Sequence, residues 1–189
     1  MAMRVLVLVT WVSLAIVAGV TPAWGHPVPD VPIWGSFEED GSVRLEVLID
    51  PRSFTDDPEG EPHLFKRTFD LMDKGERKEL TKAAQKYMED TVAFYFEPAG
   101  KVTPQFEFVF TGEAWKPLSD SEDPVMLSGV WTTKLPKGAQ GYRIEALPEG
   151  ELSVVFKNKL GGKVVERWQT LFPGEKSFVL DLTEFLKKN

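Results

Sequence analysis

The chain has 189 residues, 29 of them acidic and 22 basic, and it carries a formal net charge of −7. A surface of this sign repels phosphate backbones, which excludes nucleic-acid binding as a main role. The chain contains no cysteine, so thiol catalysis, zinc–thiolate sites, disulfides and lipoprotein anchoring are excluded as well.

The first residues have the pattern of a secretory signal peptide. An uncharged apolar run of 16 residues follows Arg4, and Ala23 and Gly25 place small side chains at positions −3 and −1 of a cut before His26. The run is shorter than the roughly 20 residues that a membrane-spanning helix needs. We therefore predict that residues 1–25 are a cleaved signal peptide.

The mature chain, residues 26–189, is long enough for a single domain with its own core. It has 21 basic and 29 acidic residues, because cleavage removes only Arg4 among the charged residues. We predict an exported protein, periplasmic or extracellular, with no integral membrane segment after cleavage.

Period-two alternation predicts many short strands. In VRLEVLID, residues 43–50, apolar side chains alternate with polar ones. The Asp40-Gly41 turn before this strand predicts a hairpin with residues 33–38. Similar segments lie at 92–96, 106–110, 142–144, 152–156, 164–170 and 178–182, with a less regular strand at 126–133. This spacing is typical of an all-β, antiparallel, immunoglobulin-like sandwich, which we predict here.

A helical period interrupts the strands at about residues 62–90, where we predict a short two-helix insertion. Two apolar stripes carry this prediction; the second has offsets of 0, 3, 4, 7 and 8 and consists of Leu80, Ala83, Ala84, Tyr87 and Met88. Gly75 separates the stripes and is expected to end the first helix. Pro62 is expected at a first helical position.

No common catalytic motif is present. The chain has no G-x-S-x-G elbow, H-E-x-x-H, P-loop or dinucleotide-binding glycine pattern. Nothing selects a catalytic pair among the 29 carboxylates. The leading hypothesis is therefore a non-enzymatic binding or accessory module of the bacterial envelope.

The two histidines support a second hypothesis, a copper-binding carrier or redox enzyme. A mature terminus at His26 would offer its α-amine and a ring nitrogen, and the His63 imidazole would complete the three-nitrogen set called a histidine brace, which suits Cu(II). We expect His63 in the first turn of a helix, whose dipole disfavours imidazolium. The carboxylates that could add an oxygen ligand are Asp30, Asp56, Asp57 and Glu61. The alternative is that the histidines never meet, since any histidine can follow a cleavage site.

The tryptophans that survive cleavage support a third hypothesis, a carbohydrate-binding module. Trp168 lies in phase with Val164 and is expected in the core, whereas Trp115 and Trp131 lie in less regular segments. The alternative is that all of them serve packing.

Several segments resemble a family of bacterial membrane proteins. HPVPD opens the mature chain, VRLEVLIDPRSF follows the Asp-Gly turn, and FEPAGK and PGEKS occur later, at residues 96–101 and 173–177. This pattern is similar to the soluble extracytoplasmic domain of proteins related to hydrogenase and urease accessory transporters. The resemblance implies metal handling by association, with no site residues assigned. Because the chain ends at Asn189 without a membrane segment, a transport role would need a membrane-protein partner.

Overall fold

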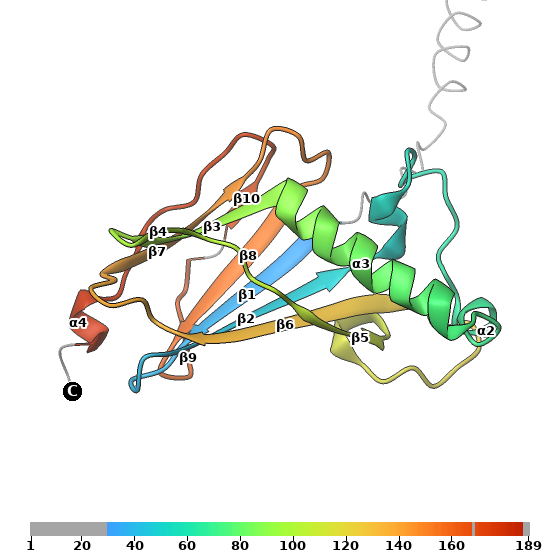
Figure 1. Ribbon diagram of the computed structural model, residues 1–189, viewed down its shortest axis with the longest axis horizontal. Coiled ribbons are helices and arrows are strands. Elements are labelled where there is room, and N and C mark those ends of the chain that lie inside the picture. Colours follow the sequence, from blue (N-terminus) through green and yellow to red (C-terminus); the bar gives the residue numbers. More distant parts are fainter. Residues whose placement is uncertain (1–29, 168, 187–189) are drawn as a thin grey trace, which may run out of the picture.

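The computed structural model describes residues 30–167 and 169–186. The predicted signal peptide, His26 and Trp168 lie outside these residues. Within the described part, strands form two facing sheets, and a helical segment is inserted between strands (Figure 1). This arrangement confirms the predicted all-β sandwich with a short helical insertion.

The larger sheet has the strand order β10-β8-β1-β2-β6-β5, with β9 beside β8. Its central hairpin turns at Asp40-Gly41 as predicted, and Gly41 has a φ of 77° that favours glycine. The strand β1 pairs in parallel with β8, whereas the other pairs are antiparallel. Its strands are β1 (Val31–Phe37), β2 (Ser42–Ile49), β5 (Glu107–Thr111), β6 (Met126–Lys134), β8 (Val154–Leu160), β9 (Lys163–Val164) and β10 (Gln169–Leu171).

The smaller sheet has the strand order β11-β7-β3-β4, in which neighbours are antiparallel. Its strands are β3 (Val92–Glu97), β4 (Gly100–Val102), β7 (Gly141–Ala146) and β11 (Leu180–Asp181). The predicted strand 164–170 is not one element, because the chain leaves β9 after Val164 and enters β10 at Gln169. The three-residue β4 is too short to show a period in the sequence.

The core lies between the sheets and is built from the inward-facing residues of each strand. In β1 the alternation is strict, and in β2 it continues as far as Val47, after which Leu48 and Ile49 are both buried. Phe94, Phe96 and Tyr142 contribute from the smaller sheet, and burial raises the pKa of the Tyr142 phenol strongly. The short helix α4 (Thr183–Leu186) follows β11.

The inserted segment contains α2 (Lys66–Phe69) and α3 (Lys74–Thr91). Asp73 begins α3 with a capping box: its Oδ1 accepts from the amides of Gly75 and Glu76 at 2.6 and 2.9 Å, and the Glu76 carboxylate accepts from the Asp73 amide at 2.7 Å. Gly75 therefore lies in the first turn of α3, and the prediction that it ends the preceding helix was wrong.

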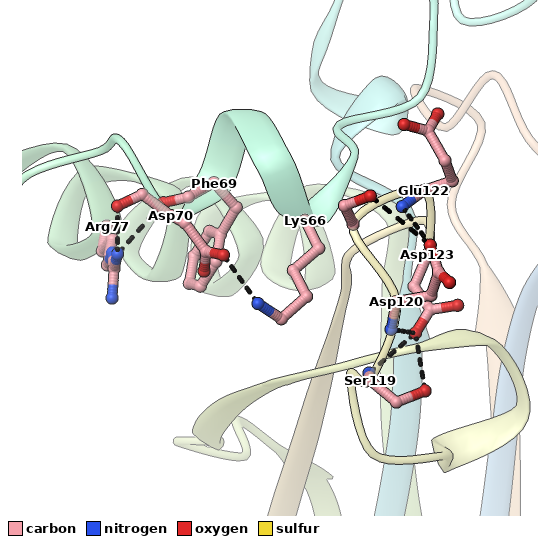
Figure 2. A network of polar contacts seen from close by, with 9 residues as sticks. Lys66, Phe69, Asp70, Arg77, Ser119, Asp120, Glu122 and Asp123 are labelled. Atoms are coloured by element: carbon pink, nitrogen blue, oxygen red, sulfur yellow. Dashed lines mark hydrogen bonds and ion pairs between the residues drawn. The ribbon is translucent and has the colours of Figure 1, made fainter.

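The first helix begins later than expected, so Pro62 is not at its first position. Phe65 forms a β-bridge with Pro124, and the Lys66 amide donates to the Asp123 carbonyl at 2.9 Å. Figure 2 shows the acidic loop at residues 119–123 beside α2. The Asp123 carboxylate accepts from the amides of Ser119 and Asp120 at 2.7 and 2.8 Å, and these bonds lower its pKa. The bridge between Phe65 and Pro124 keeps Phe65 extended, so the helix starts only at Lys66.

The helix α3 buries one face against the core. Ala84 and Met88 are fully buried and belong to the same apolar cluster as Leu45 and Phe94, while Leu80 and Tyr87 pack against that cluster. Figure 1 shows α3 running across the strands of the larger sheet, next to β3. The second layer of the sandwich is therefore part sheet and part helix.

A close approach between β6 and its neighbours β2 and β5 makes Gly129 hard to replace. A Cβ there would lie 2.5 Å from a ring carbon of Phe108 and 2.8 Å from a methyl of Val47. We expect Gly129→Ala to lower the free energy of unfolding by about 1–3 kcal/mol, because the neighbours must shift. Urea unfolding would measure this. Thr132→Ala, at an exposed position of β6, is the control and should change stability by less than about 0.5 kcal/mol.

Candidate functional site

A buried carboxylate marks one end of the sandwich. Asp50 follows the last residue of β2, is 4% exposed, and begins the short 3-10 helix η2 (Pro51–Phe54). Its Oδ1 accepts from the Arg52 amide at 3.0 Å, and its Oδ2 accepts from Arg52 Nε and Nη2 at 2.9 and 2.7 Å. The side chain of Arg52 is 11% exposed, so this is a nearly buried, two-pronged ion pair.

His63 lies against the same carboxylate. Its Nδ1 is 3.3 Å from Asp50 Oδ2, and its side chain is 33% exposed. This nitrogen is buried and makes no hydrogen bond. His63 lies in irregular backbone ahead of α2. The expected placement in the first turn of a helix was therefore wrong, and the dipole argument does not apply to His63.

A pocket of about 270 Å³ opens beside His63. It is lined by Arg52, Glu59, Gly60, Glu61, Pro62, His63 and Phe65. The loop between η2 and α2 supplies most of these residues. With Nδ1 facing Asp50, the histidine has Nε2 as its remaining nitrogen for a ligand. In proteins, a histidine that binds a metal through one ring nitrogen commonly has a carboxylate beside its second ring nitrogen.

The start of the described chain lies at the same end of the sandwich. Ile33 is opposite Val47 in the antiparallel β1–β2 pair, so the same register carries Asp30 towards Asp50. Figure 1 shows the first end of β1 and η2 on the same side of the molecule. Strand neighbours are roughly 5 Å apart. The predicted ligand His26 is four positions before Asp30 and lies outside the described residues.

The carboxylates predicted as additional ligands are distributed differently. Glu61 lines the His63 pocket, whereas Asp56 lines another pocket. Asp57 accepts from the Gly60 amide in its own turn, and Asp30 accepts from the Ser153 hydroxyl. Among residues 30–167 and 169–186, no three His, Asp or Glu side chains form a group that could hold a metal. A metal at His63 would thus need a ligand from outside this range.

Trp34, Trp115 and Trp131 pack against other side chains, and none of them lines the pocket at His63. Trp34 and Trp115 meet with ring centroids 4.6 Å apart, and Lys159 Nζ lies 5.3 Å from the Trp34 ring. Trp131 packs against the core. Trp115 follows Ala114 in the segment η3 (Glu113–Trp115), where both have positive φ, 60° and 52°. This geometry favours packing over an open sugar platform.

Comparison with known proteins adds no family to this description. A scan against models of protein families finds no match for the chain, and a search of curated proteins finds no significant relative. In the part of the chain that the structure describes, no helix is long and apolar enough to cross a membrane.

The Asp50–Arg52 pair predicts a large effect of a small change. Asp50→Asn would leave the Arg52 guanidinium nearly buried without its counter-charge, which we expect to cost about 3–5 kcal/mol of unfolding free energy. Urea unfolding at pH 7 would measure it. Asp40→Asn, which removes an exposed partner of Lys134, is the matched control with a much smaller expected loss. Equal losses for the two variants would contradict this account.

Proposed function

We propose that this protein is an exported, non-enzymatic binding module of the bacterial envelope that binds one copper ion through His26 and His63. The observation that carries the proposal is the buried Asp50 carboxylate, 3.3 Å from His63 Nδ1, at the end of the sheet where the described chain begins. A carboxylate beside Nδ1 favours Nε2 as the nitrogen for a ligand.

The chain length supports a meeting of the two histidines. Four residues in an extended conformation span at most about 14 Å. Asp30 and Asp50 end neighbouring strands, and His63 contacts Asp50. A mature N-terminus at His26 therefore has the length to reach the His63 imidazole without a change in the sandwich.

The donor chemistry supports copper over other metals. The proposed site has the His26 α-amine, one ring nitrogen of His26 and the His63 imidazole. Three nitrogens in a T shape suit the tetragonal preference of Cu(II). Glu61, in the same pocket as His63, offers an oxygen for a weaker fourth position. No thiolate competes, because the chain has no cysteine.

The resemblance to extracytoplasmic domains of accessory transporters supports an accessory role next to a membrane protein. A module of that kind needs a surface for its partner. Two large apolar side chains are exposed near the C-terminal strands. Phe172, directly after β10, is 61% exposed, and Val179, directly before β11, is 48% exposed. In this proposal copper is carried to or from a partner and takes part in no reaction on the module.

The test uses protein that a bacterial host has exported and processed. Intact mass should place the terminus at His26, and titration should show one tightly bound Cu(II) per chain. Its electron paramagnetic resonance spectrum should show coupling to three nitrogens. In His63→Ala the affinity for Cu(II) should fall by a factor of about 100 or more, because one of the three nitrogen ligands is lost.

Two controls make the outcome decisive. An additional alanine before His26 moves the α-amine to another residue, so it should abolish the three-nitrogen spectrum while the fold stays intact. Glu79→Gln, on the exposed surface of α3, should change nothing. A terminus other than His26, or copper binding that survives His63→Ala unchanged, would end the copper proposal.

A further inference from the structure

A second cavity is lined by Ser53 and Phe54 of η2 and shares no lining residue with the pocket at His63. Its volume is about 340 Å³, within the range of small-molecule pockets. Three segments enclose it: η2 with the residues after it, the second half of α3, and the turn at residues 149–152. Because they come from distant parts of the chain, the cavity exists only in the folded protein.

One wall of this cavity is aromatic and apolar. The rings of Phe54 and Tyr87 lie edge to face with centroids 5.7 Å apart. Pro58, Ala83 and Leu152 extend the apolar lining. Aromatic rings attract cations through the negative potential of their faces, and they also bury the carbon skeleton of a ligand.

The Tyr87 phenol supplies a polar group in this lining. Burial raises the pKa of Tyr87 to about 12, against the smaller opposing effect of the neighbouring Thr91 and Ser53 hydroxyls. The phenol is therefore neutral at pH 7 and adds no charge to the lining.

Negative charge dominates the rim. Four carboxylates line the cavity, those of Asp56, Asp90, Glu149 and Glu151. The only cation in the lining is Lys86, whose Nζ is 2.5 Å from Asp90 Oδ2. Asp56, Glu149 and Glu151 have no ion pair with a cation among the described residues. The rim therefore favours a positively charged ligand and opposes an anionic one.

We infer that this cavity binds a small organic ammonium ion. The ammonium group lies at the carboxylate rim, while the carbon skeleton packs on Phe54 and Leu152. The combination of an aromatic wall and a rim of carboxylates without ion pairs supports this ligand class. It requires neither His63 nor a metal.

Three probes with the same phenyl body and different head groups test the inference on the exported, processed chain. Phenethylammonium should bind, 2-phenylethanol should bind at least tenfold more weakly, and 3-phenylpropionate should not bind. Calorimetric titration gives the affinities. Amide chemical-shift changes should be confined to residues 53–58, 83–91 and 149–152. Equal affinity for the three probes, shifts elsewhere, or no binding of phenethylammonium at millimolar concentration would overturn the inference.

Matched variants separate the contributions. Tyr87→Phe keeps the aromatic wall and all charges of the lining, so it should change phenethylammonium binding by less than about twofold. Replacing Asp56, Glu149 and Glu151 by their amides should weaken it at least tenfold and make the remaining affinity insensitive to salt. Glu79→Gln makes the same kind of change on α3 away from the cavity and should leave binding unchanged. Unaltered binding in the triple variant would refute the role of the rim.

Discussion

The ion pair of one buried carboxylate, Asp50, determines the structure at the end of the sandwich where His63 lies. The Asp50 carboxylate is taken out of water where β2 ends, and a charge in that position must be paired to be tolerated. Arg52 pairs with it from two residues away, which bends the chain into η2. His63 approaches it from the far side of the following loop. Arg52 and His63, at the two ends of this loop, therefore both contact a single carboxylate, and residues of the loop line two separate pockets.

The main features of the fold could be predicted because they depend on local periodicity. The β1–β2 hairpin follows from alternation and from the Asp-Gly turn, and α3 follows from the spacing of Leu80, Ala84 and Met88. The errors occur where a distant segment decides the local conformation. Phe65 pairs with Pro124, and the helix therefore starts only at Lys66 even though Pro62 suits a helix start. In the same way, Gly75 follows an N-cap rather than ending a helix, because Asp73 and Glu76 form a capping box.

The candidate site could be predicted only in part. His63 is identifiable because the chain has just two histidines. Asp50 could not be selected among so many carboxylates, since its burial depends on the register of β2 in the sheet. An aspartate directly between an apolar strand and a proline was the one available signal, as it suggests a cap. The second cavity left no signal in the sequence, because its walls come from three segments that only the folded chain brings together.

The parallel pairing of β1 with β8 has a consequence for how the chain acquires its structure. The first strand of the described chain is paired with one of the last, with Val31 opposite Val154. The larger sheet therefore cannot be completed until the chain has been synthesised as far as β8. The same arrangement closes a long loop in one step, which slows folding and leaves the β1 edge unpaired until β8 docks.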